Sequence, residues 1–250
     1  MSKLPIIKFQ NVSVSFQAQD SLVSVLNDVN FEIASNSFSI IYGPSGSGKT
    51  TVLNMLLGML PPTKGKVLVG GVDIYAMNQD ERSKFRAKHF GMVYQTNNWI
   101  TSLTVLENIA LPLYLGGANY EAALKDAMNS LKRVGLDEYA HYRPSVLSIG
   151  QQQRISMARA TIVTPELLVA DEPTGNLDSK NGDMIMQLIA SFKNNNNSTI
   201  VLVTHNLDYL PLSDHRLFIK DGVVTQDTGG YLPESVEKLV TAVDGKGLRK

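Results

Sequence analysis

The sequence lacks cysteine, a net charge and any long apolar run, and each absence excludes a class of function. Without cysteine, the 250-residue chain has no disulfide bond, thiol nucleophile or thiolate metal site. Its 23 basic and 23 acidic residues balance, so we expect no nucleic-acid partner. No apolar run approaches the ~18 residues that span a bilayer, and the first ten residues lack the apolar core of a signal peptide. If the protein serves membrane transport, we therefore expect another chain to supply the pore.

Short apolar runs and helical segments alternate along the chain, as is typical of an α/β fold. The runs at 38–42, 167–171 and 199–204 are apolar over nearly their whole length, as expected for strands buried on both faces of a parallel sheet. The chain before residue 68 predicts strands around one helix, whereas residues 80–160 predict mostly helix. We therefore expect a mostly parallel sheet combined with a helical region in the middle of the chain.

Local signals predict where turns and helix ends lie. Asp221-Gly222 is typical of a hairpin turn, and Pro61-Pro62 should end the first helix. Apolar residues at helical spacing predict a helix over 120–134, and the asparagine tract 194–197 predicts a loop. The apolar spacing over 236–243 predicts a short helix in the tail.

The segment 43–50 (GPSGSGKT) fits the phosphate-binding pattern G-x-x-x-x-G-K-[ST]. It lies between an expected buried strand and an expected buried helix, where glycines let backbone N–H groups and the helix N-terminus face phosphates. Lys49 can then reach the β- and γ-phosphates, and the Thr50 hydroxyl can ligate Mg²⁺. A loop that only caps a helix is the alternative, but it would leave a costly lysine at the start of a buried helix.

Two acids, Asp171 and Glu172, follow an apolar strand, and His205 follows the next one. The carboxyl ends of parallel strands face the ligand crevice of an open sheet. There Asp171 would orient the shell of Mg²⁺, and Glu172 would polarise a water in line with the γ-phosphate. Taken alone, an acid pair mostly marks the solvated end of a strand, so the functional interpretation depends on the phosphate loop.

The segment 147–151 (LSIGQ), followed by QQR, resembles the L-S-G-G-Q signature of the ABC ATPase family. The resemblance covers nearly the whole chain. In that family the signature belongs to a helical subdomain and covers the ATP held by the opposite subunit. The residues agree with this role, because Ser148 and Gln151 form a capping box that predicts a helix start suited to a γ-phosphate.

Further positions resemble the family pattern in order and spacing. Gln95 resembles the glutamine that contacts Mg²⁺ and the attacking water, and His205 the switch histidine that senses the γ-phosphate. Asp178 resembles the communicating residue of the loop that crosses the dimer interface. Phe16 stands where the family has an aromatic that stacks on adenine, although a strand face shared with Val12 and Val14 would explain it as core.

The resemblance implies a P-loop NTPase core of the RecA type, with an N-terminal antiparallel β subdomain and an inserted helical subdomain over about 91–160. It divides the chain into an ATPase domain, 1–228, and a short helical tail, 229–250. The cofactors it implies are ATP and Mg²⁺, with Glu172, His205 and Gln95 catalytic and Thr50, Gln95 and Asp171 on the metal. The residues expected at the nucleotide are Phe16, Gly43, Ser45, Gly46, Ser47, Gly48, Lys49, Thr50, Thr51, Ser148, Gly150, Gln151 and Asp178.

Ile149 departs from the family pattern, which has glycine at this position. Isoleucine adopts positive φ only at a cost, and its β-branch adds bulk at a helix start. Either the backbone there is an ordinary helix N-terminus that tolerates isoleucine, or the ATP sandwich is weakened. Because the other catalytic positions match, we expect tolerance.

The runs 171–178 (DEPTGNLD), 104–113 (TVLENIALPL) and 134–137 (VGLD) are similar to one bacterial subfamily. It includes lipoprotein-releasing, macrolide-exporting, antimicrobial-peptide-resistance and cell-division ATPases. The resemblance implies a homodimer, or a heterodimer with a sister ATPase, that drives membrane permease subunits of the four-helix type from the cytoplasmic face of the inner membrane. We expect the apolar stretch 103–115 to help receive a coupling helix of the permease, the alternative being core of the helical subdomain.

Three other functions explain less of the sequence. A soluble ABC ATPase of genome maintenance or translation would carry a long coiled coil or two cassettes. A P-loop kinase or GTPase would have no reason to carry the signature segment or His205. A degenerate cassette that only senses nucleotide is supported by Ile149 alone. We therefore expect a transport or mechanotransmission ATPase.

Overall fold

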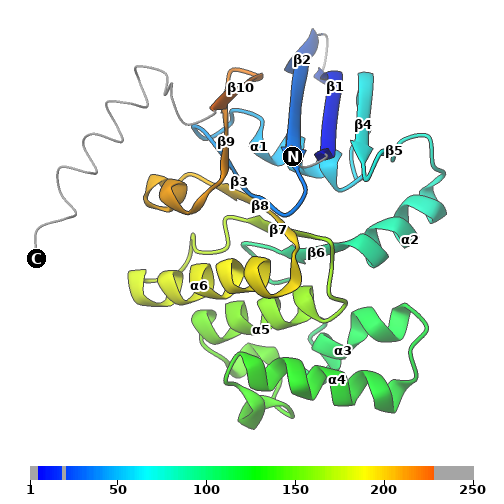
Figure 1. Cartoon of the computed structure of the whole chain (residues 1–250). Coiled ribbons are helices and arrows are strands. Elements are labelled where there is room, and N and C mark those ends of the chain that lie inside the picture. The colour runs from blue at the N-terminus through cyan, green and yellow to red at the C-terminus, as the bar shows by residue number, and fades with distance from the viewer. Residues whose placement is uncertain (1–4, 19–20, 228–250) are drawn as a thin grey trace, which may run out of the picture. The chain divides into compact units, whose positions relative to one another are not determined.

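The computed structural model describes residues 5–18 and 21–227 (Figure 1). These residues form two compact units, one of the described residues up to Ile74 together with those from Val203 onward, and the other of Tyr75–Leu202. The predicted tail helix over 236–243 lies outside the described residues. In the part of the chain that is described, no helix has both the length and the apolar character needed to cross a membrane.

The first unit contains an antiparallel sheet of four strands in the order β2-β1-β4-β5 (Figure 1). Along β2, Leu26, Val29 and Ile33 are buried while most of their neighbours are exposed, so one face of the sheet packs into the core. The strands are β1 (Pro5–Ala18), β2 (Ser21–Ala34), β4 (Lys64–Val69) and β5 (Val72–Asp73).

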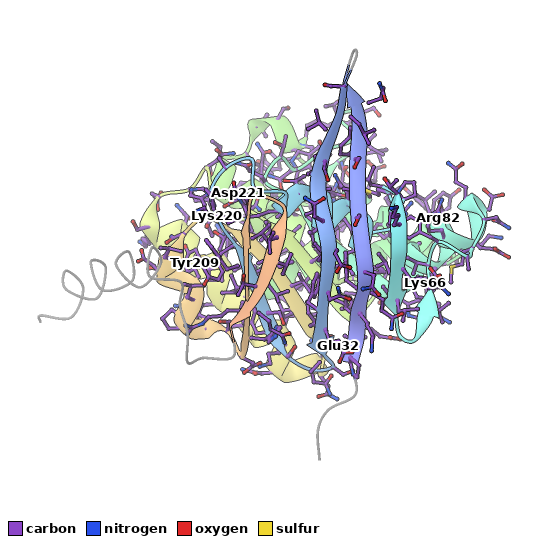
Figure 2. All side chains as sticks on the ribbon, turned by 90° about the horizontal axis from the view of Figure 1, so that it is seen from above. Glu32, Lys66, Arg82, Tyr209, Lys220 and Asp221 are labelled. Carbon is purple, nitrogen blue, oxygen red and sulfur yellow. The ribbon has the colours of Figure 1, made fainter. Side chains whose placement is uncertain are left out.

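The same unit holds a parallel strand pair and the helix that follows it. Strand β3 (Phe38–Tyr42) is buried throughout and pairs in parallel with β9 (His215–Lys220), which pairs antiparallel with β10 (Val223–Asp227). Helix α1 (Lys49–Leu56) follows β3, and a 3₁₀ helix, η3 (Leu207–Leu212), precedes β9. The β9–β10 turn, beside Lys220 and Asp221 in Figure 2, confirms the predicted hairpin.

The second unit is built from parallel strands and helices (Figure 1). Strand β6 (Phe90–Val93) pairs in parallel with β7 (Leu167–Asp171), and β8 (Thr199–Thr204), which starts in this unit, neighbours β7 in the sheet order. Burial along β7 and β8 confirms the strands predicted at 167–171 and 199–204. The chain is therefore α/β, with mostly parallel strands besides the antiparallel sheet.

The second unit contains five α-helices, and four of them confirm the predicted helical region over about 80–160. Ile109 of α3, Leu131 of α4 and Ile155 of α5 are completely buried and share one apolar cluster. The helices are α2 (Gln79–His89), α3 (Val105–Leu115), α4 (Tyr120–Arg133), α5 (Ile149–Thr161) and α6 (Ser179–Asn196), with 3₁₀ turns η1 (Asp137–Tyr139) and η2 (Pro144–Val146) between α4 and α5.

Two predicted boundaries are wrong. The asparagine tract is not a loop, because α6 continues through Asn196 and only Asn197, with φ 56°, turns into the left-handed conformation that ends a helix. Buried Ile185 and Ile189 anchor α6, so packing outweighs the weak helix propensity of asparagine. Helix α1 ends at Leu56, well before the two prolines, because the chain turns at Gly58 with φ 69°.

Candidate functional site

In the first unit, the loop between β3 and α1 has the geometry of a phosphate cradle. Gly43 follows β3 directly, and a β-carbon built on it would fall 2.0 Å from the carbonyl oxygen of Ile219. Helix α1 starts after Gly48, which has no side chain that could cap the helix, and a helix N-terminus of this kind can bind an anion. Ser47 Oγ is buried without a hydrogen-bond partner among the described residues. A phosphate group would satisfy these donors.

Lys49 folds back over this loop. Its Nζ donates to the carbonyl oxygens of Gly43 and Pro44, each at 2.9 Å. The ammonium therefore already lies at the mouth of the cradle, where it can exchange a carbonyl partner for phosphate oxygens. Thr50 and Thr51 occupy the first turn of α1 beside it.

Phe16 and His205 also belong to the first unit. Phe16 is 41% exposed near the end of β1, whereas Val12 and Val14 are buried. The shared-face explanation of Phe16 as core is therefore wrong, because its side chain is exposed although it alternates in step with Val12 and Val14. His205 is exposed directly after β8, where Thr204 Oγ1 accepts the N–H of Asn206 and turns the chain.

In the second unit, β7 ends at Asp171, and Glu172 follows it with φ 44°. A positive φ is uncommon for a residue other than glycine, asparagine or aspartate, and such conformations gather at functional sites. The chain turns back at once, because Gly175 N–H donates to the Glu172 carbonyl oxygen at 3.1 Å. Gln95 lies at this turn: its Nε2 is 3.0 Å from where a β-carbon of Gly175 would be. The fold therefore brings Gln95 to the segment that carries Glu172.

The signature segment starts α5 through the predicted capping box, which is confirmed. Ser148 N–H donates to Gln151 Oε1 at 2.9 Å, and Gln151 N–H donates to Ser148 Oγ at 3.3 Å. Ile149 is the first helical residue, and its side chain is 57% exposed. The backbone there is thus an ordinary helix N-terminus that isoleucine can occupy.

Asp178 caps α6 in the same unit. Its Oδ1 accepts the Asn181 N–H at 2.9 Å, and its Oδ2 accepts Asn181 Nδ2–H at 2.7 Å. These hydrogen bonds, the backbone one first, lower the pKa of the Asp178 carboxyl, which is ionised at neutral pH. Asn181 Oδ1 also lies 2.9 Å from the β-carbon position of Gly150, so the signature segment adjoins the Asp178 loop.

The exposed, helical setting of Ile149 predicts that Ile149→Gly changes ATP turnover less than tenfold. Glycine at a helix start costs at most about 1 kcal/mol and removes a side chain that points mainly to solvent. Steady-state ATPase assays, with thermal unfolding as the control for folding, measure the effect. A rise in turnover above tenfold would show that Ile149 obstructs the site.

Sequence reasoning missed a group of side chains around the Gln95 loop. Trp99 Nε1–H donates to Gln152 Oε1 at 2.8 Å, and the Arg159 guanidinium lies 4.4 Å from the centre of the Trp99 ring. Burial is the main cause that lowers the pKa of Arg159, and it also raises the pKa of Tyr94. The only sequence signal was a lone tryptophan four residues after Gln95, since the contacts themselves are tertiary.

Comparisons with known proteins agree on one family. A family model described as ABC transporter matches residues 26–175. The ABC transporter ATP-binding protein YtrE of Bacillus subtilis is 37% identical over 87% of this chain and 96% of its own length. The lipoprotein-releasing system ATP-binding protein LolD of Shewanella oneidensis is 35% identical over 93% and 98%. The ATP-binding cassette MJ0796 of Methanocaldococcus jannaschii has been solved as a dimer in a post-hydrolysis state bound to ADP and Pi. Its structure is 36% identical in sequence, has a TM-score of 0.83, and is matched over 90% of this chain and 100% of that chain.

Proposed function

The chain belongs to the ABC transporter family as an ATP-hydrolysing cassette, and we propose that two such cassettes enclose two ATP molecules and thereby move separate membrane subunits. The dimer would be of two copies of this chain or of this chain with a sister ATPase. A symmetric dimer is possible because one chain carries a complete set of motifs. The dimeric MJ0796 structure supports this arrangement.

The observation that carries the proposal is a second helix N-terminus suited to phosphate in the same chain. The loop before α1 is sufficient to hold the phosphates of one ATP. The exposed Ser148 and the start of α5 belong to the other unit and offer a further anion site. If this second site faces the ATP of the partner cassette, each nucleotide is held by two chains, and closure depends on ATP.

The residues expected at the metal fit Mg²⁺ in chemical kind. Thr50 hydroxyl, Gln95 carbonyl and Asp171 carboxylate are oxygen donors, the ligand type that Mg²⁺ prefers. Bound Mg²⁺ neutralises charge on the β- and γ-phosphates. We assign phosphate binding to the loop Gly43–Thr51 with Lys49, and adenine stacking to the exposed Phe16.

Hydrolysis needs a base and groups that hold the γ-phosphate. Glu172 would accept the proton of the attacking water, which Gln95 helps to orient. His205 would donate to the γ-phosphate, and Ser148, Gly150 and Gln151 of the partner would cover it. Asp178, ionised and next to the signature segment, would link the two sites of the dimer. The chemistry is then mainly positioning and charge stabilisation.

For the biological role, we propose the branch of the family that acts in lipoprotein release, export or mechanotransmission. The likeness to LolD supports this branch. The cassette would bind peripherally to a permease of the four-helix type at the cytoplasmic face of the inner membrane. We also propose that the ATPase domain spans residues 1–228 and that residues 229–250 form a short C-terminal tail.

Purification from native membranes tests the role. Tagged Glu172→Gln protein, isolated with ATP and Mg²⁺, should bring down a multi-pass membrane protein with a large extracytoplasmic domain. Recovery of soluble proteins only, or of none, would contradict the transport function. The same preparation without nucleotide controls for non-specific membrane binding.

Within the stretch 103–115, the structure separates core from surface. Ile109 is fully buried in the helical core, whereas Leu115 is 75% exposed at the end of α3 and Tyr114 is 52% exposed beside it. We therefore predict that Leu115→Arg cuts the recovery of the membrane protein at least tenfold without unfolding the cassette. Quantitative pull-down, with circular dichroism of the isolated variant, measures both effects.

A matched control is Val223→Arg, which places the same charge on an exposed apolar residue of β10 in the other unit. It should leave the recovery unchanged. Ile109→Arg should unfold the protein, because it buries an unpaired charge. Full recovery of the membrane protein with Leu115→Arg would place the contact elsewhere.

A further inference from the structure

Trp99, the sole tryptophan of the chain, joins the segment after Gln95 to helix α5. Its indole N–H donates to Gln152 Oε1 at 2.8 Å, and Arg159 stacks on its ring with the guanidinium carbon 4.4 Å from the centroid. Gln152 and Arg159 are two helical turns apart on α5, so both face the same side. The ring is therefore fixed at its edge and on its face by one helix.

The same helix also holds the backbone on both sides of Gln95. Gln153 Nε2 donates to the Tyr94 carbonyl oxygen at 3.1 Å. Arg159 Nη2 donates to the carbonyl oxygen of Asn97 at 2.6 Å, and its Nη1 reaches that of Asn98 at 3.4 Å. The exposed side chain of Gln95 thus extends from a backbone segment, residues 94–99, that is attached to α5 on both sides of Gln95. We call residues 94–99 the Gln95 segment.

The connection continues to the signature segment. Gln152, which accepts from Trp99, donates through its Nε2 to the carbonyl oxygen of Leu147 at 3.0 Å. Leu147 immediately precedes Ser148, the residue that caps α5. The amide group of Gln152 therefore bonds through its oxygen to the Gln95 segment and through its nitrogen to the residue before the N-cap of α5, the helix that we call the signature helix.

We propose that Trp99 is a positioning residue that, through Gln152 and Arg159, makes the Gln95 segment and the signature helix move as one body. The inference rests on the proposed function, in which Gln95 acts on the ATP of its own chain and the signature acts on that of the partner. A rigid link would transmit a shift at one nucleotide site to the other. Trp99 itself would touch neither ATP nor the reacting atoms.

Packing alone would not require these contacts. Trp99 also packs against the apolar cluster of α3, α4 and α5, a role that any large apolar side chain could fill. An apolar side chain of the same size cannot offer Gln152 a hydrogen-bond donor and Arg159 an aromatic face at once, whereas the indole offers both. Arg159 has no carboxylate within ion-pair distance among the described residues, so carbonyl oxygens and this ring are the partners that hold it.

Two substitutions separate packing from positioning. Trp99→Leu fills space but removes both polar contacts, and it should lower kcat for ATP hydrolysis about tenfold while the Kd for ATP changes less than twofold. Trp99→Phe keeps a ring for Arg159 and should give an intermediate kcat. Phe85→Leu, which alters a half-buried aromatic on α2, is the matched control and should leave kcat unchanged. Equal kcat for Trp99→Leu and Phe85→Leu would overturn the proposal.

A double-mutant cycle with Gln152 tests the link directly. If Trp99 acts through Gln152, the double variant Trp99→Phe with Gln152→Leu should be no slower than the slower single variant. If the reductions in kcat of the two single variants multiply in the double variant, the proposed link is wrong. Gln152→Glu keeps an acceptor for the indole but loses the donor to Leu147, so it should preserve the fluorescence of Trp99 and still lower kcat.

Tryptophan fluorescence reports on Trp99 alone, because Trp99 is the sole tryptophan of the chain. In the Glu172→Gln background, Mg-ATP should change the emission of Trp99, and Gln152→Leu should abolish that change while the fold is retained. An emission that ignores Mg-ATP would contradict the proposal. If the unaltered chain itself neither hydrolyses ATP nor dimerises, the proposed function fails; if it does both and the Trp99 variants behave like it, only this inference fails.

Discussion

Glu172→Gln is expected to lower ATP turnover at least 100-fold while ATP binding is retained. A positioned general base contributes about 10²- to 10⁴-fold to a rate, and an amide cannot accept the proton of the attacking water. Glutamine has nearly the volume of glutamate, so the turn in which the Glu172 carbonyl accepts from Gly175 should persist. Because hydrolysis would no longer reopen the dimer, the variant should accumulate as an ATP-bound dimer. Phosphate release and size-exclusion chromatography with ATP measure the two effects.

Glu166→Gln is a suitable control for this result. Glu166 is an exposed acid of the same unit that pairs with His89 and has no role in the proposed chemistry. Its loss should leave turnover within about twofold, since exposed ion pairs contribute little. A Glu172→Gln protein that stayed monomeric with ATP would count against both the base assignment and the ATP sandwich.

The elements predicted from the sequence are those whose signal is local. Strands β3, β7 and β8 are short apolar runs, and such runs indicate burial on both faces whatever lies around them. The end of α6 was predicted wrongly because asparagine favours loops only when packing does not decide, and buried Ile189 holds the last turns of this helix in place.

The same distinction applies to the site. The loop Gly43–Thr50 and the capping box of Ser148 and Gln151 are defined by neighbours in the chain, so pattern reasoning reached them. The left-handed backbone of Glu172 has no sequence signal, since nothing about glutamate predicts a positive φ. The Trp99–Gln152 bond joins residues more than fifty positions apart, and only the folded chain brings them together.

Gly43→Ala is expected to destabilise the fold by about 3 kcal/mol and to abolish ATP binding. The new β-carbon would fall 2.0 Å from the Ile219 carbonyl oxygen, inside van der Waals contact, and φ at Gly43 is 153°. Ile219 is held in β9, which pairs with β3 on one side and β10 on the other, so its backbone cannot move aside cheaply. The loop must shift instead, and Lys49 loses the Gly43 carbonyl that positions its ammonium. Urea unfolding and titration with a fluorescent ATP analogue measure both losses.

Gly46→Ala separates steric conflict from conformational cost in the same loop. Gly46 has φ 76°, yet a β-carbon there would meet no described atom within 4 Å. Alanine at this position should therefore cost only the ~1 kcal/mol of a left-handed backbone and weaken ATP binding modestly. If both variants lose similar stability and ATP affinity, positive φ and not contact with β9 makes Gly43 necessary. If Gly43→Ala loses much more than Gly46→Ala, the strand behind the phosphate cradle determines its shape.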